Sequence, residues 1–212
     1  MRVPTLTPSF LDRAREYYGD AVGVIADDGR TFTYAEIGER VDRLSNALRD
    51  LGVDAGDRVA TISPNVHWAI EAMFAIQQLG AIFVPLNNRL LAEDYEYLLS
   101  DSGAAVAIVD HAYASTIESI RDEVPTESFV CYGATEVDGD WLEYETVLSN
   151  ADASPPDRPD IGENDPATIN YTSGTTGRPK GAVRTHRTDV WNAVLHAFNA
   201  ELKDDVVYLW TL

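Results

Sequence analysis

One short segment of the chain, residues 169–181, combines glycines, hydroxyl side chains and a lysine in a way that suits a polyphosphate. Glycine lets the backbone turn its N–H groups toward an anion without a Cβ in the way. Serine and threonine hydroxyls donate to phosphate oxygens or ligate Mg²⁺, and lysine adds a positive charge. The candidate residues are Thr172, Ser173, Gly174, Thr175, Thr176, Gly177 and Lys180. Lys180 and Lys203 are the only lysines in the sequence, so a lysine kept inside this loop indicates a function.

The spacing within the loop disfavours a P-loop of the Walker A type. That pattern places four residues between its first glycine and a Gly-Lys pair, which Ser or Thr then follows. Counted from Gly174, the second glycine would fall on Pro179. The sequence therefore gives little support to a P-loop kinase or ATPase. A flexible polar surface loop is the structural alternative, and the length and specific composition of the segment oppose it.

Other residues with chemical potential are scattered along the chain. His186 follows the loop and either faces a nucleotide, caps a helix or lies on the surface. His67, His111 and His196 lack the spacing of metal ligands, so no metal site is expected among them. Cys131, the only cysteine, lies in an apolar run and is expected to be an unreactive buried thiol.

Helix-period and strand-like runs alternate along the chain, and this alternation predicts an α/β fold. Strands are predicted at residues 58–62, 81–84, 105–109, 129–132 and 167–171. Helices are predicted at residues 9–18, 34–51, 64–79, 92–99, 113–121 and 188–201. A hairpin is expected from 22–25 and 31–33, followed by a capping box of Thr33 and Glu36. The sequence thus predicts a mostly parallel sheet flanked by helices.

A proline-rich stretch at residues 151–163 breaks this alternation and contains little that could be buried. It predicts a linker between a first α/β subdomain, residues 1–150, and the start of a second, residues 164–212, which carries the candidate loop. A last apolar run at 206–210 predicts a core strand. Because domains rarely stop inside a core strand, the second subdomain is expected to be truncated.

The composition is strongly acidic, with 35 Asp and Glu against 16 Lys and Arg and a formal net charge of −19. Such a charge disfavours nucleic acids and anionic membranes as partners, because both would be repelled. High acidity with few lysines indicates a halophilic protein, whose surface is adapted to molar salt. No apolar run approaches the roughly 18–20 residues of a membrane span, and no signal peptide is evident. A cytoplasmic location is therefore expected.

Residues 171–181, Tyr-Thr-Ser-Gly-Thr-Thr-Gly-Arg-Pro-Lys-Gly, resemble the signature loop of the adenylate-forming, or AMP-binding, superfamily. Further segments are similar to acyl-CoA synthetases of that superfamily. They are Thr-Tyr-Ala-Glu at 33–36, Gly-Asp-Arg-Val-Ala at 56–60, Ser-Pro-Asn at 63–65 and Gly-Ala-Ile-Phe-Val-Pro-Leu-Asn at 80–87. The resemblance extends over nearly the whole chain and favours a fatty-acyl or related CoA ligase over a peptide-synthetase domain.

The resemblance implies an enzyme that joins a carboxylic acid to AMP, releases pyrophosphate and then passes the acyl group to coenzyme A. The substrates it implies are ATP with Mg²⁺, a small carboxylic acid, with a fatty acid favoured, and CoA. In the superfamily the signature loop holds the β- and γ-phosphates, a role that falls here on the candidate residues named above. Thr172 is the implied hydroxyl nearest Mg²⁺. The implied fold is the N-terminal part of the large domain.

The chain also departs from the superfamily, whose members are much longer. Their aromatic-Gly-x-Thr-Glu motif and their late adenylation lysine have no counterpart here. Residues 134–136, Ala-Thr-Glu, lie in the wrong context, and Lys203 lies too close to the loop. The chain alone is therefore expected to be inactive, with the catalytic residues outside it. A non-catalytic nucleotide- or phosphate-binding remnant is the alternative. The particular acid, the thiol acceptor and the oligomeric state stay open.

Overall fold

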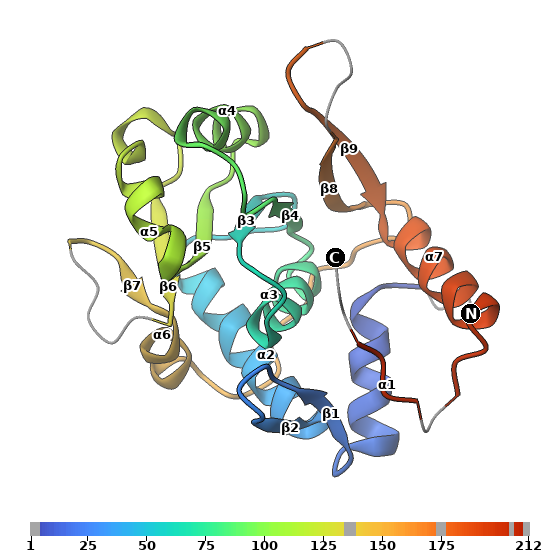
Figure 1. Cartoon of the computed structure of the whole chain (residues 1–212). Coiled ribbons are helices and arrows are strands. Elements are labelled where there is room, and N and C mark those ends of the chain that lie inside the picture. Colours follow the sequence, from blue (N-terminus) through green and yellow to red (C-terminus); the bar gives the residue numbers. More distant parts are fainter. Residues whose placement is uncertain (1–4, 134–138, 173–176, 204–205, 210–212) are drawn as a thin grey trace.

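A seven-stranded sheet forms the centre of the computed structural model, which describes residues 5–133, 139–172, 177–203 and 206–209 (Figure 1). The strand order is β7-β6-β5-β3-β4-β8-β9. The strands are β3 (Arg58–Ile62), β4 (Ile82–Leu86), β5 (Val106–Asp110), β6 (Ser128–Tyr132), β7 (Leu142–Glu143), β8 (Pro166–Thr172) and β9 (Lys180–Thr185). Every neighbouring pair is parallel except β8 and β9, which are antiparallel. The α/β fold with a mostly parallel sheet is confirmed.

Helices cover both faces of the sheet, as the alternation of buried side chains along the strands requires. They are α1 (Pro8–Tyr18), α2 (Tyr34–Asp50), α3 (His67–Gln78), α4 (Ala92–Ser102), α5 (His111–Glu118), the 3₁₀ helix η1 (Arg121–Glu123), α6 (Tyr144–Asn150) and α7 (His186–Asn199). In β5, Val106 and Ile108 pack with α1, α2, α3 and α6. Ala107 and Val109 face the opposite way, toward α4 and α5. Two hydrophobic cores thus sandwich the central strands.

Local signals in the first part of the chain are confirmed. The strands β1 (Val22–Ile25) and β2 (Thr31–Thr33) pair antiparallel. The Thr33 side chain accepts a hydrogen bond from the Glu36 N–H at 3.2 Å, and the Glu36 carboxylate accepts one from the Thr33 N–H at 2.7 Å. This reciprocal cap fixes the start of α2, whose apolar face then packs in the core.

Strand β4 runs past the residue at which the sequence predicted its end. It extends to Leu86, with Pro85 inside it opposite Thr61 of β3. Proline cannot donate a ladder hydrogen bond and is tolerated where a neighbouring strand is missing. The pairing of β4 with β8 is confined to Phe83 and Thr168, so Pro85 lies where β8 is no longer paired.

The expected strand at residues 206–210 is wrong over residues 206–209, which are not in a strand. Val207 is 82 % exposed and Leu209 is 78 % exposed. These side chains have neither a neighbouring strand nor a core to pack against in the described part of the chain, so the apolar run alone does not produce a strand. Conversely, β9 was not predicted, because most of its side chains are exposed and carry no alternation.

Residues 151–163 contain no helix or strand and lie along α2. Three α2 side chains donate to backbone carbonyls of this segment: Arg43 to Ala151, Asn46 to Asp152 and Ser154, and Arg49 to Asp157. The donors are spaced three residues apart and so share one face of the helix. The division into subdomains on either side of this segment stays a prediction. No helix in the described ranges is long and apolar enough to cross a membrane.

Candidate phosphate-binding site

The candidate loop connects β8 to β9, and the pairing of these strands brings its two ends together. Thr172 lies opposite Lys180 in the ladder, and the Thr172 hydroxyl donates to the Lys180 carbonyl at 3.5 Å. Thr172, Gly177 and Lys180 are exposed. The other four candidates, residues 173–176, lie outside the described residues. The described candidates therefore lie exposed at and beside the paired ends of two strands.

The position of β8 in the sheet explains where the candidate loop lies. Because β8 runs parallel to β4, the loop follows its carboxyl end, at the same edge where β3, β4, β5 and β6 end. In open α/β sheets, ligands bind outside the carboxyl ends of the strands. The candidate loop thus stands at the edge of the sheet where this fold class places its ligands.

Gly181, the first residue of β9 after Lys180, permits close packing within the hairpin. A Cβ at this position would lie 2.8 Å from Cγ2 of Ile169 and 3.3 Å from Cζ of Tyr171. A larger residue at this position would therefore require the Ile169 and Tyr171 side chains to shift. Gly181 belongs to the recognised segment but was not among the candidate site residues.

Two side chains of α4, Tyr97 and Asp101, also contact the hairpin. The Tyr171 hydroxyl donates to Asp101 at 2.7 Å, and partial burial together with this bond raises the pKa of Tyr171. Tyr97 lies beneath Arg178, whose Cζ is 4.9 Å from the centre of the tyrosine ring. The Tyr97 hydroxyl also donates to the Pro179 carbonyl at 3.1 Å. Sequence reasoning missed all three contacts. Pairs that are 70 and 82 positions apart leave no local pattern.

His186 is enclosed by protein rather than open to a nucleotide. It is the first residue of α7 and has no exposed surface. Its Nδ1 lies 3.2 Å from the Thr7 hydroxyl and 3.4 Å from the Thr7 backbone nitrogen, so it ties α7 to the start of α1. Burial lowers the pKa of His186. Of the interpretations left open by the sequence, the nucleotide-facing one is not supported by this contact.

Cys131 is buried in β6, as expected, and burial raises its pKa to about 11. A thiol with a raised pKa holds little of the reactive thiolate at neutral pH. Within the described ranges, no group of three His, Cys, Asp or Glu side chains is arranged to hold a metal ion.

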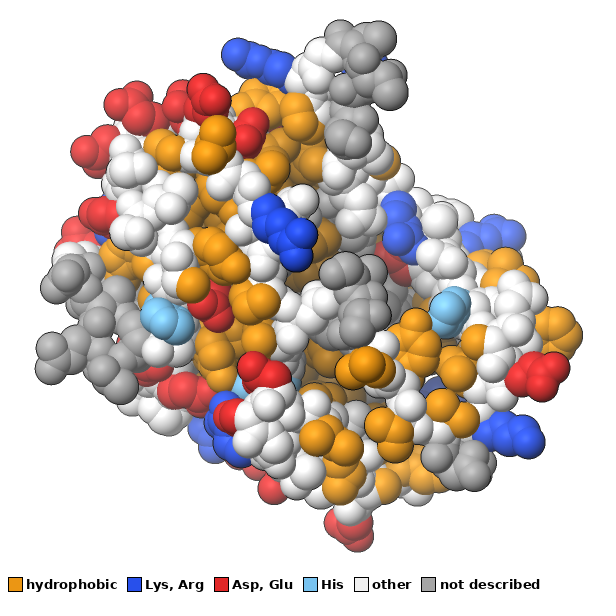
Figure 2. Space-filling view, viewed as in Figure 1, with side chains coloured by type: hydrophobic (Ala, Val, Ile, Leu, Met, Phe, Trp, Pro, Cys, Tyr) orange, Lys and Arg blue, Asp and Glu red, His pale blue; other side chains and the backbone are white. Residues whose placement is uncertain are grey.

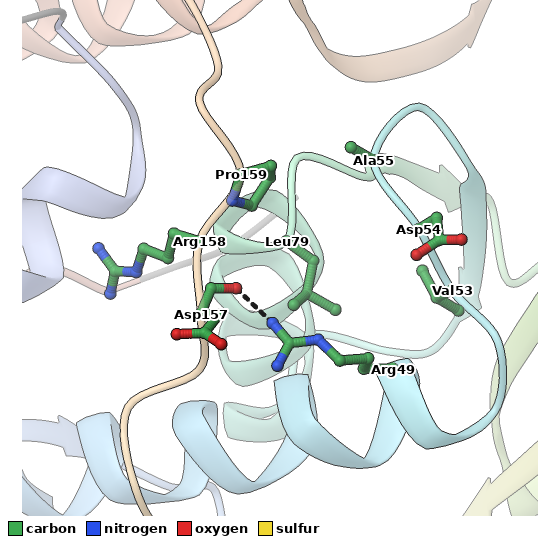
Figure 3. Close-up of a pocket in the computed structure, with 8 residues that line it drawn as sticks. All are labelled: Arg49, Val53, Asp54, Ala55, Leu79, Asp157, Arg158 and Pro159. Carbon is green, nitrogen blue, oxygen red and sulfur yellow. Dashed lines mark hydrogen bonds between the residues drawn. The ribbon is translucent and has the colours of Figure 1, made fainter.

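A separate pocket lies at the opposite edge of the sheet, next to the loop that leads into β3 (Figure 3). Its volume is about 530 Å³, and it is lined by Arg49, Val53, Asp54, Ala55, Leu79, Asp157, Arg158 and Pro159. Both guanidinium groups have partners within the protein: Arg49 donates to the Asp157 carbonyl, and Arg158 binds the carboxylate of Asp12 at 2.6 and 2.8 Å. These contacts attach residues 157–159 to α2 and α1. They leave the candidate loop as the better place for an anionic ligand.

Comparison with known proteins agrees with this arrangement. The family described as AMP-binding enzyme matches residues 10–212. Feruloyl-CoA synthase of Amycolatopsis sp is 41 % identical over 177 residues, which cover 84 % of this chain and 33 % of that protein. The long-chain-fatty-acid–CoA ligase of Thermus thermophilus is 37 % identical over 203 residues, 92 % of this chain and 35 % of its own length.

A crystal structure of the anthranilate CoA ligase AuaEII, in complex with anthranoyl-AMP, has a similar fold. The TM-score is 0.88 at 28 % sequence identity, over 94 % of this chain and 38 % of that one. The chain spans about a third of the length of the curated relatives it matches. The family match covers nearly all of the chain, including the candidate loop. The chain therefore belongs to the AMP-binding enzyme family.

Proposed function

We propose that this chain supplies the polyphosphate-binding part of an ATP-dependent ligase that joins a carboxylic acid to the thiol of coenzyme A. The observation that carries the proposal is the β8–β9 hairpin, which presents Thr172 and Lys180 together at the carboxyl edge of the sheet. The relatives named above are CoA ligases or synthases, which supports the reaction class.

In this proposal the loop binds the β- and γ-phosphates of ATP. Lys180 supplies a positive charge, and the hydroxyls and backbone N–H groups of residues 172–177 supply donors. Holding ATP in one position lets the carboxylate attack the α-phosphorus, with pyrophosphate as leaving group. Where Mg²⁺ accompanies ATP, the Thr172 hydroxyl would supply one oxygen ligand to it. An exposed hydroxyl with a long bond of 3.5 Å fits that role, because its oxygen is open to a ligand.

The substrate acid is the least defined part of the proposal. One relative is named for feruloyl-CoA and another for long-chain fatty acids, so aromatic and aliphatic acids both enter the test. A fatty acid stays the specific prediction from the sequence. The test panel therefore contains ferulate, a medium-chain and a long-chain fatty acid, with ATP and Mg²⁺ in each case.

Acid-dependent exchange of labelled pyrophosphate into ATP tests the adenylation step in the protein that carries this sequence. Lys180→Ala should lower exchange about 10- to 100-fold, the effect of removing one hydrogen bond to a charged group. Lys203→Ala is the matched control, since it removes the only other lysine, which is also exposed. Exchange that is equal in Lys180→Ala and the unsubstituted protein would reject the role of Lys180.

Measuring ATP binding together with pyrophosphate exchange separates the ligase from the alternative, a non-catalytic nucleotide-binding protein. Binding of ATP that depends on Lys180, without exchange for any acid in the panel, would favour the alternative. No binding of ATP or inorganic tripolyphosphate at all would reject both.

The acidic composition supports one further proposal, adaptation to high salt, while a cytoplasmic location stays a prediction from the sequence. Repulsion within a chain of net charge −19 is screened over roughly 3 Å at 1 M salt, and over roughly 10 Å at 0.1 M. The melting temperature should therefore rise between about 0.1 and 3 M KCl. A constant melting temperature across that range would contradict the adaptation to salt.

A further inference from the structure

Helix α4 contacts the β8 end of the candidate loop through one carboxylate. Tyr171 is the last residue before Thr172, and its hydroxyl donates to Oδ2 of Asp101 at 2.7 Å. Asp101 is exposed, so its carboxylate stands at the surface beside the hairpin. Because Tyr171 and Thr172 are consecutive in β8, a fixed Tyr171 restricts where Thr172, at the start of the loop, can lie.

The same helix contacts the β9 end of the candidate loop through Tyr97. The Tyr97 hydroxyl lies 3.1 Å from the Pro179 carbonyl and 3.4 Å from Oδ1 of Asp101. It has one proton, so the shorter contact, to Pro179, is the hydrogen bond that it donates. Pro179 directly precedes Lys180, so this bond positions the backbone that carries the lysine.

Arg178 rests on the same tyrosine. Its Cζ lies 4.9 Å from the centre of the Tyr97 ring, within the range of a cation–π contact. A guanidinium held by its face keeps its N–H donors free at its edge. Among the described residues, neither Arg178 nor Lys180 forms an ion pair. Both cations are therefore available to an anionic ligand.

The helix that makes these contacts is itself firmly packed. Tyr97 and Asp101 are four residues apart and share one face of α4. The opposite side of the helix is buried in the core, with Tyr95 at 1 %, Leu98 at 2 % and Leu99 at 0 % exposure. Both ends of the loop, at β8 and at β9, thus contact one well-packed helix. Such an arrangement holds a binding site in a fixed geometry.

We propose that Tyr97 and Asp101 are positioning residues for the polyphosphate loop, and that Tyr97 presents Arg178 to the phosphates as a second cation beside Lys180. This inference rests on the proposed function, because it assigns a ligand to the same loop. It adds three residues that the signature segment alone does not assign to phosphate binding. It also gives a role to the polar face of α4, which is far from the loop in sequence.

Steady-state exchange kinetics with substituted α4 test the proposal. Tyr97→Phe removes the hydrogen bond and keeps the ring, and should raise the KM for ATP about 2- to 10-fold. Tyr97→Leu removes the ring as well and should have the larger effect. The KM for the acid and the melting temperature should change little. Tyr17→Leu is the matched control, because Tyr17 is 65 % exposed on α1.

Asp101 provides a rescue that a merely structural role would not show. Asp101→Ala removes the acceptor of Tyr171 and should raise the KM for ATP. Asp101→Asn keeps an acceptor oxygen and should return the KM close to the unsubstituted value. A KM for ATP that is unchanged in both Asp101→Ala and Tyr97→Leu would overturn the positioning role. Equal changes in the KM for acid and ATP would also overturn it.

A double-mutant cycle tests the presentation of Arg178. Arg178→Ala should raise the KM for ATP in the unsubstituted protein and do so less in the Tyr97→Leu background, because the guanidinium has then lost its support. Additive effects would reject the presentation by Tyr97.

Hydrogen exchange separates failure of this inference from failure of the proposed function. It is measured over residues 171–181 of the ligand-free protein and needs no activity. Faster hydrogen exchange over these residues in Tyr97→Leu supports the positioning role of Tyr97, even if no acid gives ATP–pyrophosphate exchange. Unchanged hydrogen exchange in Tyr97→Leu rejects the positioning role, even if the protein is an active ligase.

Discussion

The central strands and the C-terminal pair of β9 and α7 are packed in opposite ways. All five residues of β5 are buried, whereas the first four residues of β9 are exposed. On α7, Trp191 is 55 % exposed and Phe198 is 80 % exposed. Hydrophobic side chains lie open on the right-hand side of Figure 2, where Figure 1 places α7. The first region is held by a desolvated core, while the second has only part of a core in the described residues.

A buried polar network marks the well-packed region. Glu71 has no exposed surface, and Arg40 pairs with it at 2.8 Å. The Tyr144 hydroxyl donates to the same carboxylate at 2.8 Å. In the hairpin region, by contrast, Tyr171, Tyr97 and Arg178 are held by a few contacts near solvent. We infer that changes in the first region affect the stability of the fold, whereas changes in the hairpin region mainly alter the position of the loop.

The largest expected effect is on the buried network. Glu71→Ala should lower the free energy of unfolding by about 3 to 5 kcal/mol, because the buried Tyr144 hydroxyl loses its acceptor and Arg40 keeps only the exposed Glu145 as an ion-pair partner. Denaturant unfolding measures the change. Glu39→Ala on the same helix as Arg40 is the control, since Glu39 is 55 % exposed and pairs with Arg43 on the surface. A loss below about 1 kcal/mol for Glu71→Ala would break the contrast between the regions.

A matched pair of leucines sharpens the comparison. Leu48 of α2 is 0 % exposed and Leu195 of α7 is 54 % exposed. Leu48→Ala should cost about 2 to 5 kcal/mol of stability, because it removes buried surface and leaves a cavity. Leu195→Ala should change stability by no more than about 0.5 kcal/mol. Equal losses would show that another part of the protein covers α7 under the conditions of the measurement.

The same contrast explains how far the sequence could predict the fold. The strands at 105–109 and 129–132 are continuous apolar runs, and burial on both faces is what produces such runs. The cap at Thr33 and Glu36 is a local signal and was read correctly. β9 was missed because its exposed side chains carry no pattern. The run at 206–210 was misread, because an apolar run predicts a strand only if the fold supplies a neighbour for it.

The candidate site divides in a similar way. Its residue types were visible in the sequence, and the pairing of Thr172 with Lys180 follows from a hairpin that closes around the loop. The contribution of α4 was not visible, because Tyr97 and Asp101 meet the hairpin only through the tertiary fold. The roles of the loop residues themselves stay predictions until they are measured.

Two capping threonines provide a test of intermediate size. Thr33 accepts from the Glu36 N–H at the start of α2, and Thr185 accepts from the Thr188 N–H at the start of α7, both at 3.2 Å. Thr33→Ala should cost about 1 kcal/mol in global unfolding. Thr185→Ala should mainly speed hydrogen exchange within α7, because a weakly packed helix opens locally before the protein unfolds. Equal global losses from the two caps would contradict local opening of α7.

The smallest expected effect is a pH dependence shared by two buried histidines, one in each region. Burial lowers the pKa of both His67, at 4 % exposure, and His186, at 0 %. A histidine whose folded-state pKa lies below the unfolded value of about 6.5 binds a proton on unfolding, so stability rises with pH in that window. Its contribution is complete above about pH 6.5 and declines as the pH falls toward the folded-state pKa.

Denaturant unfolding between about pH 5.5 and 7.5 should therefore show less than one proton taken up per histidine. Carboxylates with lowered pKa values, such as Glu36 and Asp152, lose their contribution below this range and do not interfere. His67→Gln should flatten the pH dependence in the global transition. His186→Gln should flatten it to the same extent only if contact of α7 with Thr7 is kept until the whole protein unfolds. A slope that changes with His67→Gln alone would show that α7 separates first, which is the sharpest form of the difference between the two regions.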